Sequence, residues 1–451
     1  MSPDLDRIFK AYDVRGVVPD ELDVDTARRI GAAFASWTGA PRILIGRDCR
    51  LSSPDLAAAL AEGATAIGAG VTDLGLASTD LLYFASGSLS LPGIMLTASH
   101  NPPNYNGMKF CLAGARPVGQ DTGLEDIRAL AAGPELGRAT APGSVEHRDL
   151  LDEYVEHVLT FVDVDAMRPL SVVIDTANGM GGLVAPAVLA RLPVKVQHLF
   201  PELDGTFPNH PADPIDPANQ RDLKAAVLGF GADIGLAFDG DADRVFLVDE
   251  RAEGVSGSIV TALVAKALLK RNPGAPVVYN LICSWTVPEV IREEGGQPVR
   301  TRVGHSFIKQ VMAETGAVFG GEHSGHYYFR DNYFADSGLI AAVIALGELS
   351  SAGVPLSELL APFRRYEASG EINSVVEDPA GRIEAIAAHF ADGTQDRTDG
   401  LTVEFPDWWA NVRASNTEPL LRLNVEARTQ ELLDERTAEL LTLIQDEGGT
   451  R

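Results

Sequence analysis

The sequence predicts a multidomain α/β protein, and three observations support this fold class. The chain has 451 residues, which is too long for one ordinary hydrophobic core. Short runs rich in β-forming residues alternate with helical patterns through most of it, as in layered α/β domains. The C-terminal part instead carries several strand patterns in series before one amphipathic helix. We therefore expect three α/β domains followed by an α+β domain.

The first α/β domain is expected at residues 1–143. It contains strand patterns at Arg42–Ile45 and Ile94–Thr97, with a helical pattern at Ser53–Gly68 between them. The segment Ala132–Val145 is rich in Ala, Gly and Pro and has no apolar periodicity. The first domain boundary is therefore placed within this segment.

The next two domains repeat the alternation. The second, at residues 144–250, is expected to contain a helix at Asp149–Val162 and strands at Ser171–Asp175, Ile234–Phe238 and Val245–Val248. The third, at residues 251–363, is expected to contain helices at Ser258–Lys270 and Leu339–Leu349 and strands at Pro276–Asn280 and Ala317–Phe319.

The last domain, at residues 364–451, has a different pattern. Its expected elements are strands at Glu371–Val376, Gly400–Phe405, Trp408–Ala414 and Leu420–Ala427 and an amphipathic helix at Gln430–Gln445. Strands in series before one helix are typical of an α+β domain.

The composition excludes several classes of protein. The formal charge of −26, with only 37 Lys and Arg residues, disfavours binding to nucleic acid or to an anionic membrane surface. Cys49, Cys111 and Cys283 form no disulfide or zinc pattern, and the N-terminus lacks the apolar stretch of a signal peptide. No apolar run reaches the roughly 18 residues of a membrane span. We expect a cytoplasmic protein.

Three aspartates in FDGDADR are the most specific chemical signal. Asp239, Asp241 and Asp243 alternate along the chain, so their carboxylates can converge on one face of a short extended loop. All-oxygen ligation of this kind suits Mg²⁺. An EF-hand calcium loop would need Gly where Arg244 stands, and a solvated acidic turn seldom sits between two apolar strands. A catalytic metal site is the preferred interpretation.

A second signal is LTASHNPPNYNGMKF, from Leu96 to Phe110, in which an apolar strand leads into a loop with two prolines. Ser99 beside His100 could act as a nucleophile at the strand end. Taken alone, the loop is more often an ordinary polar turn. The G-x-S-x-G motif of serine hydrolases is absent around Ser99, which disfavours acyl transfer.

A third signal is RASNTEP, from Arg413 to Pro419, which groups a guanidinium with small polar side chains. Such groups can hold phosphate oxygens, although a structural polar loop is equally compatible with this segment alone. The segment GARPVGQD lacks the lysine of a P-loop, and NGMGGLV lacks the third glycine of a dinucleotide-binding fingerprint. Nucleotide use is disfavoured.

Together these segments resemble the α-D-phosphohexomutase family, in the family's order and across nearly the whole chain. TASHNPPNYNGMK looks like the phosphoserine loop, FDGDADR like the metal loop, GEHSGH at Gly321–His326 like the sugar-specificity loop, and RASNTEP like the phosphate-binding loop. FKAYDVRG, DGTFPNHPADP and VGHSFIK are supporting matches. The resemblance implies three similar α/β domains with mixed sheets and a C-terminal α+β domain around a central cleft.

By the same resemblance, Ser99 is the phosphorylated residue, and its phosphate completes the Mg²⁺ shell begun by the three aspartates. His100 and Lys109 are the preferred candidates for proton transfer, and Tyr12, Arg15, His305 and His326 are further candidates. The other implied substrate contacts are Arg244, Glu322, Ser324, Arg413, Ser415, Asn416, Thr417 and Arg422.

The implied reaction transfers phosphate from Ser99 to the free C1 or C6 hydroxyl of a hexose phosphate. The resulting hexose 1,6-bisphosphate turns over in the cleft and returns its other phosphate to Ser99. A hexose 1,6-bisphosphate is also the expected activator, because loss of the intermediate leaves Ser99 unphosphorylated. The protein is expected to be a monomer or a homodimer.

The loops look most like those of the phosphomannomutase branch, which interconverts mannose 6-phosphate and mannose 1-phosphate. Phosphoglucomutase or dual specificity remains the alternative, and Ile282 stands where many dual-specificity members have Lys. A metal-dependent phosphatase is disfavoured because Asp243 breaks the D-x-D-x-[TV] motif. A non-catalytic sugar-phosphate binder is disfavoured because the serine and the aspartates are intact.

Overall fold

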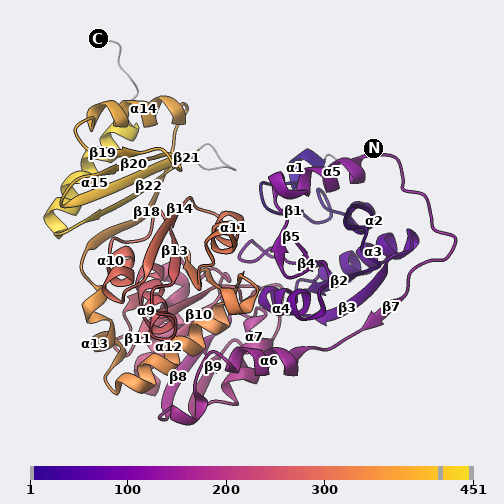
Figure 1. The fold of residues 1–451 in the computed structure, drawn as a ribbon, viewed down its shortest axis with the longest axis horizontal. Helices are drawn as coiled ribbons and strands as arrows, with labels where there is room; N and C mark the ends of the chain where they lie inside the picture. The colour runs from indigo at the N-terminus through magenta and orange to yellow at the C-terminus, as the bar shows by residue number, and fades with distance from the viewer. Residues whose placement is uncertain (1–4, 415–419, 446–451) are drawn as a thin grey trace.

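The structure is a computed structural model that describes residues 5–414 and 420–445. Figure 1 shows four units, coloured from indigo to yellow along the chain. Three α/β domains lie side by side, and the α+β domain extends from the third. The predicted fold class is confirmed.

Domain I has a mixed seven-stranded sheet in the order β1-β5-β4-β2-β3-β7, with β6 paired to β5. Its elements are α1 Leu5–Ile8, β1 Val14–Val17, α2 Val24–Thr38, β2 Arg42–Arg47, α3 Ser53–Ala66, β3 Gly70–Leu76, α4 Thr79–Leu89, β4 Gly93–Leu96, β5 Tyr105–Leu112, β6 Arg116–Pro117, α5 Leu124–Ala132 and β7 Val145–His147.

Domain II has a five-stranded sheet in the order β12-β11-β10-β8-β9. Its elements are α6 Leu151–Leu159, β8 Leu170–Asp175, α7 Gly181–Leu189, β9 Val194–Leu199, α8 Arg221–Phe230, β10 Ile234–Phe238, β11 Val245–Asp249 and β12 Gly254–Val255.

Domain III has a five-stranded sheet in the order β14-β13-β15-β16-β17. Its elements are α9 Gly257–Arg271, β13 Pro276–Asn280, α10 Thr286–Glu293, β14 Gln297–Thr301, α11 His305–Thr315, β15 Phe319–Gly321, β16 Tyr327–Phe329, β17 Ala335–Asp336, α12 Gly338–Ala352 and α13 Leu356–Leu360.

Domain IV has an antiparallel sheet in the order β18-β22-β21-β20-β19. Its elements are β18 Glu367–Val375, α14 Pro379–His389, β19 Thr394–Asp396, β20 Leu401–Glu404, β21 Trp408–Ala414, β22 Leu420–Ala427 and α15 Gln430–Gln445.

The three α/β domains share one topology. In each, a first strand (β2, β8 or β13) pairs in parallel with the second (β3, β9 or β14) and the third (β4, β10 or β15). A fourth strand (β5, β11 or β16) then pairs antiparallel with the third. The repeat was implied only by the family resemblance, because the three copies share too little sequence to be seen in one chain.

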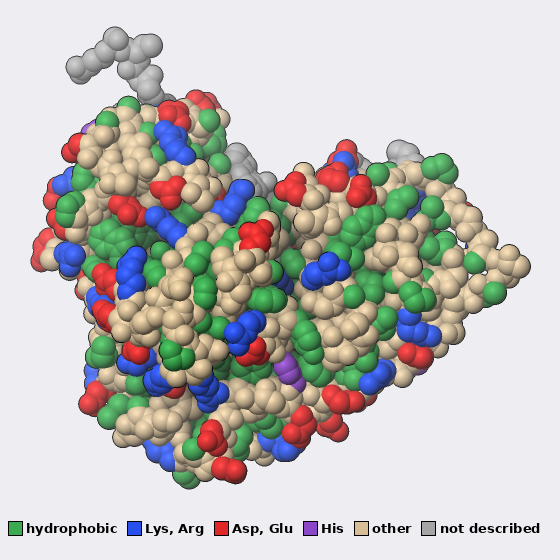
Figure 2. All heavy atoms as spheres, viewed as in Figure 1, with side chains coloured by type: hydrophobic (Ala, Val, Ile, Leu, Met, Phe, Trp, Pro, Cys, Tyr) green, Lys and Arg blue, Asp and Glu red, His purple; other side chains and the backbone are tan. Residues whose placement is uncertain are grey.

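Packing makes the first three domains one block. A single hydrophobic cluster contains buried residues of all three, including Leu82 of α4, Val184 of α7 and Val343 of α12. Domain IV instead has its own core, built from the sheet and the helices α14 and α15. Figure 2 shows a notch between domain IV at the upper left and domain I at the upper right.

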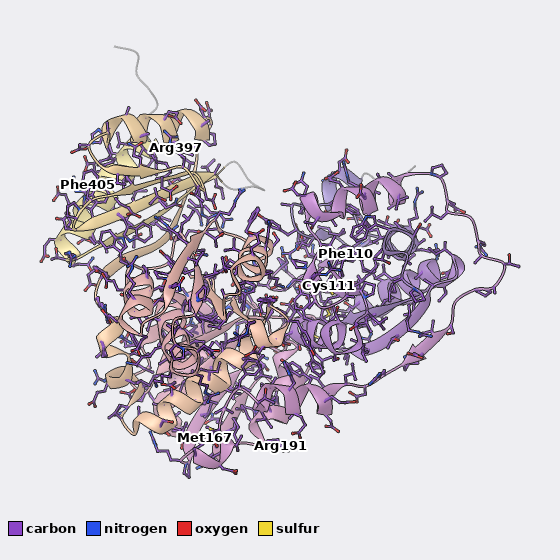
Figure 3. The ribbon with its side chains drawn as sticks, viewed as in Figure 1. Phe110, Cys111, Met167, Arg191, Arg397 and Phe405 are labelled. Atoms are coloured by element: carbon purple, nitrogen blue, oxygen red, sulfur yellow. The ribbon has the colours of Figure 1, made fainter. Side chains whose placement is uncertain are left out.

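The side chains of strand β5 alternate between two hydrophobic cores, one on each face of the sheet of domain I. Phe110 and Cys111 are adjacent and both buried, and Figure 3 labels them within this domain. Because successive side chains of a strand point to opposite faces, Phe110 packs with Phe34 of α2, ring centroids 5.4 Å apart, whereas Cys111 joins the core shared with domains II and III. Each buried side chain of the size of Phe contributes about 1.5–3 kcal/mol.

The expected elements are present, with shifts at some ends. The expected helix at Asp149–Val162 is α6 at Leu151–Leu159, and the expected strand at Ala317–Phe319 is β15, which begins at Phe319. The proposed boundaries at 143/144 and 250/251 remain proposals. Strands β7 and β12 follow those two boundaries but still pair with the sheets of domains I and II.

No single helix among the described residues is long and apolar enough to cross a membrane. One sharply bent pair, Gly338–Ala352 with Leu356–Phe363, meets the criteria on length and composition alone.

Asp80 lies where the three α/β domains meet. It is fully buried near the start of α4 and accepts hydrogen bonds from Ser78, from Tyr154 of α6, and from the hydroxyl of Ser337, 2.7 Å away, at the N-cap of α12. Burial raises the pKa of Asp80 from 3.8 to about 6, although the three donors act in the opposite direction. This carboxylate therefore joins all three domains at a cost in desolvation.

The raised pKa of Asp80 predicts that the free energy of unfolding depends on pH. Because its pKa is higher in the folded protein than in the unfolded chain, its stabilising contribution is complete below about pH 4 and is lost as the pH rises through about 6. Between about pH 5 and pH 7, the unfolding free energy of wild type should fall relative to that of Asp80→Asn by roughly 1 kcal/mol. Guanidinium denaturation of both proteins measures this difference, and a pH-independent difference would contradict it.

Candidate active site

The site is built from the same position of each repeat. The third strands of the three repeats, β4, β10 and β15, correspond to one another. Each leads directly into one of the loops predicted from the sequence. Ser99 follows β4, Asp239 follows β10 and Glu322 follows β15. Carboxyl ends of parallel strands are the usual location of sites in α/β sheets. The repeated topology therefore brings three distant loops toward one region.

Ser99 is held in an uncommon conformation against the acidic loop. Its φ is 47°, in the left-handed region that non-glycine residues rarely adopt. Its N–H donates to the hydroxyl of Thr97 at 3.0 Å, and its Oγ donates to Oδ2 of Asp239 at 2.6 Å. The side chain is only 5% exposed. Such strain at a polar residue is typical of functional sites.

Arg50 holds this loop in place, and sequence reasoning missed it. Its side chain is fully buried and its guanidinium donates to the carbonyls of Ser99, Asn101, Pro102 and Tyr105 at 2.7–3.0 Å. Asp48 neutralises it at 3.1 Å. A planar guanidinium with five donors can bind four carbonyls at once, which an ammonium cannot do. Arg50 is thus the positioning residue of the Ser99 loop.

Replacing Arg50 by Lys should lower kcat by roughly 100-fold while charge is retained, because misplacement of a reacting group by about 1 Å costs that much. The measurement is kcat, alongside circular dichroism to verify folding. The matched control is Arg42→Lys at the other end of β2, where Arg42 pairs with Glu146 away from the loop. Unchanged kcat in Arg50→Lys would show that the carbonyl contacts do not position Ser99.

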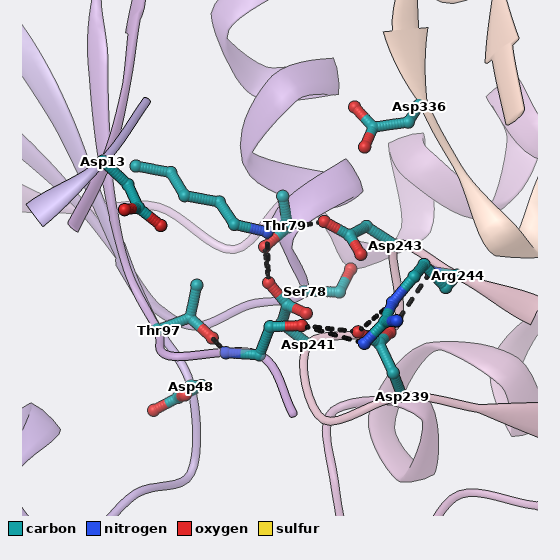
Figure 4. A network of polar contacts seen from close by, with 12 residues as sticks. Asp13, Asp48, Ser78, Thr79, Thr97, Asp239, Asp241, Asp243, Arg244 and Asp336 are labelled. Atoms are coloured by element: carbon teal, nitrogen blue, oxygen red, sulfur yellow. Dashed lines mark hydrogen bonds and ion pairs between the residues drawn. The ribbon is translucent and has the colours of Figure 1, made fainter. Parts of the chain in front are cut away.

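The three aspartates of FDGDADR converge as the sequence predicts. Oxygens of Asp239, Asp241 and Asp243 lie within 4.8 Å of one another, and all three residues are buried. Figure 4 shows the three carboxylates in one cluster, with Arg244 beside Asp239. Burial raises the pKa of Asp239 to about 7, and its two neighbours add to the effect against Arg244. Three buried carboxylates this close together repel one another, and this repulsion favours bound cations.

The same group passes a more specific test for a metal ion. Oδ1 of Asp241 and Oδ1 of Asp243 are buried without a hydrogen-bond partner in the structure. Buried polar atoms are otherwise almost always satisfied. With an oxygen of Asp239, they provide the all-carboxylate donor set that suits Mg²⁺. The residues present therefore fit the predicted metal.

Two cations and one histidine surround the aspartates. Nζ of Lys109 lies 2.8 Å from Asp241 and 2.6 Å from Asp243. Burial opposes the charge on Lys109, but the two carboxylates outweigh it and hold the pKa of Lys109 well above its usual range. Nε of Arg244 lies 3.0 Å from Asp239, and Nη2 of Arg244 donates to Nδ1 of His100 at 2.6 Å.

Arg244 determines the protonation of His100. Its positive charge, aided by desolvation, lowers the pKa of His100 well below the usual range. Because Nδ1 accepts from the guanidinium, the ring is neutral and cannot donate from that atom. The structure thus brings His100 to Ser99, with Nδ1 3.3 Å from Oγ, but disfavours its use as a general acid.

The predicted sugar-specificity loop, at Gly321–His326, lies against the aspartates. Nδ1 of His326 is 3.0 Å from Asp336 and 3.8 Å from Asp243, and these carboxylates raise its pKa against the effect of burial. Glu322 is 2% exposed and accepts from Asn280, from the N–H of Gly304 and from Tyr328. Ser324 is half-buried in the same loop. Glu322 is thus engaged by protein groups rather than presented to solvent.

The other predicted site residues are placed as follows. Arg15 joins β1 to the Ser99 loop through Asn101, at 2.5 Å. Tyr12 packs edge-on against Phe307 of α11. His305 begins α11, but its side chain is not described, and Ser415, Asn416 and Thr417 lie outside the described residues.

Arg413 and Arg422 lie in domain IV, on β21 and β22, and both pair with Glu371. None of their contacts among the described residues involves the Ser99 loop or the aspartates.

Comparisons with known proteins show the family to which the chain belongs. Four models of the phosphoglucomutase/phosphomannomutase family match the chain: α/β/α domain I at residues 6–135, domain II at 152–254, domain III at 256–366 and the C-terminal domain at 371–443. The chain belongs to the phosphohexomutase family. A phosphomannomutase of Salmonella montevideo is 43% identical over 97% of this chain and 98% of its own.

Two further relatives extend over the whole chain. A protein of Xanthomonas campestris named as phosphohexose mutases is 42% identical over 97% of this chain and 99% of its own. A crystal structure of a phosphoglucomutase/phosphomannomutase family protein from Burkholderia thailandensis has a TM-score of 0.90 at 35% identity and covers 98% of both chains. The protein is therefore an isomerase, and its chain matches all four domain models of the family.

Proposed function

We propose that this phosphohexomutase is a phosphomannomutase that interconverts mannose 6-phosphate and mannose 1-phosphate through phosphorylated Ser99. The observation that carries the proposal is the contact of Ser99 Oγ with Asp239 at 2.6 Å, beside three buried carboxylates and two cations. The relatives named phosphomannomutase support the choice of mannose. We expect the protein in the cytoplasm.

The proposed first half-reaction breaks the bond between phosphorus and Ser99 Oγ and forms a bond from phosphorus to the sugar hydroxyl. The sugar hydroxyl loses its proton to a nearby base, and Oγ of Ser99 takes up a proton as it leaves. The imidazole of His326, beside Asp243, is the candidate base, whereas the two carboxylates hold Lys109 in its charged form, so Lys109 can only donate a proton. The second half-reaction reverses these steps at the other end of the hexose 1,6-bisphosphate, which also serves as the activator.

The aspartates would hold Mg²⁺, and the ion would supply neutralisation of the charge on the transferring phosphoryl group. Arg244 can reach an oxygen on Ser99, since Nη2 lies 3.5 Å from Oγ. The left-handed conformation of Ser99 fixes the direction of its Oγ. The chain itself thus orients the transferred group before substrate arrives.

Dual specificity is the second candidate function. The relative named as phosphohexose mutases, at 42% identity, favours it over strict mannose specificity. Ile282 follows β13 and is 6% exposed, so it supplies an apolar side chain where a lysine would supply a phosphate contact. Ile282 therefore favours mannose specificity over dual specificity.

Phosphorus NMR of the purified protein with Mg²⁺, a trace of hexose 1,6-bisphosphate and mannose 6-phosphate tests the proposal. A mannose 1-phosphate signal is the expected result, and the relative rate with glucose 6-phosphate decides between single and dual specificity. Orthophosphate as the sole product would indicate a phosphatase. Absence of any change would indicate a non-catalytic binder or a different sugar.

A further inference from the structure

Arg413 and Arg422 form an unfavourable pair at the base of the predicted phosphate-binding hairpin. They are direct cross-strand neighbours in the register of β21 and β22. Like charges opposite each other destabilise a sheet. The side chains are 11% and 31% exposed, and Nε of each is buried without a hydrogen-bond partner among the described residues. Two guanidiniums with spare donors therefore need an anion.

Glu371 of β18 supplies that anion in this structure. Its Oε2 lies 2.7 Å from Nη2 of Arg413, and its Oε1 lies 3.2 Å from Nη1 of Arg422. Each carboxylate oxygen thus takes one arginine. A phosphate also binds guanidinium N–H groups through separate oxygens. Glu371 therefore occupies donors that a substrate phosphate would use.

A β-bulge aims Glu371 at the arginines. The register of β18 against β22 shifts between Ala368 and Glu371, and Gly370 in the bulge has a φ of +68°. The hydroxyl of Ser369 stabilises the bulge, because it accepts a hydrogen bond from the N–H of Val425 at 3.0 Å. Without the extra residue, every later side chain of the strand would change faces.

The bulge decides which face of β18 carries Glu371. In the observed register Glu371 shares a face with Arg422, while its neighbour Ile372 packs against the core of domain IV. A slip of one residue would direct Glu371 into that core and leave the arginines without their carboxylate. The local irregularity is thus tied to the ion pairs.

We propose that Glu371 is a counter-ion that competes with the substrate phosphate for Arg413 and Arg422. This competition limits how tightly domain IV binds the phosphate. This inference rests on the proposed function, in which a bisphosphate must leave this hairpin in mid-reaction to present its other end. Glu371 neutralises the arginines at the moment when the phosphate departs. Without it, departure would expose two partly buried like charges to each other.

Glu371→Gln keeps the shape of the side chain and removes the competing charge. The dissociation constant for inorganic phosphate, measured by calorimetry on the protein without sugar, should fall by roughly five- to tenfold, the effect of one nearby charge in a partly buried site. For mannose 6-phosphate, KM and kcat should both fall, because tighter binding slows reorientation. Adding Arg413→Ala to Glu371→Gln should remove the gain in phosphate affinity.

Glu404→Gln is the matched control, since Glu404 is a half-buried carboxylate of the same domain that pairs with Arg300, at 2.8 Å, instead. It should leave phosphate affinity, KM and kcat unchanged. Weaker or unchanged phosphate binding in Glu371→Gln would overturn the inference, because Glu371 would then only orient the arginines. If wild type lacks mutase activity, the proposed function fails, but the phosphate titration still decides the role of Glu371.

Discussion

The Ser99→Ala variant is expected to lose phosphohexomutase activity by more than about 10⁴-fold, because in the proposed reaction Ser99 carries the phosphoryl group between half-reactions. Ser99 is the one serine whose Oγ lies against the aspartates in the described part of the chain. Intact-mass spectrometry after incubation with hexose 1,6-bisphosphate should show one phosphoryl adduct on wild type and none on the variant. The phosphorus NMR assay supplies the rate.

Ser88→Ala is the matched control for Ser99→Ala. Ser88 also lies in domain I, on α4, and within the described chain its hydroxyl donates a hydrogen bond only to the carbonyl of Ala85. This control should retain both activity and the phosphoryl adduct. Adduct formation in Ser99→Ala would place the covalent step on another residue and contradict the role of Ser99.

Loss of the metal ion is expected to have the second largest effect. Chelation should stop turnover by wild type and added Mg²⁺ should restore it. Asp241→Asn should lower kcat by roughly 10³-fold, because it removes one ligand charge and one partner of Lys109. Wild type should also melt at a higher temperature with Mg²⁺ than without it, because a ligand that binds the folded state stabilises it.

The melting shift makes the metal prediction independent of catalysis. In Asp241→Asn the increase in Tm with Mg²⁺ should largely disappear. Asp249→Asn is the control, since Asp249 is equally buried on β11 but pairs with Arg364 rather than with the site. Its Mg²⁺ response should persist even if its baseline Tm falls. Equal responses in wild type and Asp241→Asn would exclude the aspartates as the metal site.

The long, periodic elements of the fold were predictable from local patterns. The helices α3, α9 and α15 and the strands β8, β10 and β13 lie close to their expected ranges. The three strands are apolar runs that are buried along nearly their whole length, a pattern that is visible in the sequence. Short strands such as β1 and β17 have too few residues to show a period. Their pairing depends on partners far along the chain, which local patterns do not contain.

The residues of the candidate site also fall into those that the sequence predicts and those that it does not. Asp239, Asp241 and Asp243 stand out in sequence because adjacent carboxylates repel and need a reason to be together. Arg50 and Glu371 do not stand out, because a single charged residue near a loop is usually a solvated one. A polar cluster directly after β2, at Asp48 to Ser53, was the available signal for Arg50.

The sequence by itself determined the α/β and α+β character of the four domains, the residue types of the Ser99 and aspartate loops, and the family to which they belong. These properties are local, since they depend on residue types and spacings within one segment. The tertiary structure decided which side chains serve those loops, namely Arg50 under Ser99, Lys109 between two aspartates, and Glu371 on the arginines of domain IV. Those contacts join residues far apart in the chain. They depend on sheet register and domain packing, which balance many weak interactions across the whole molecule.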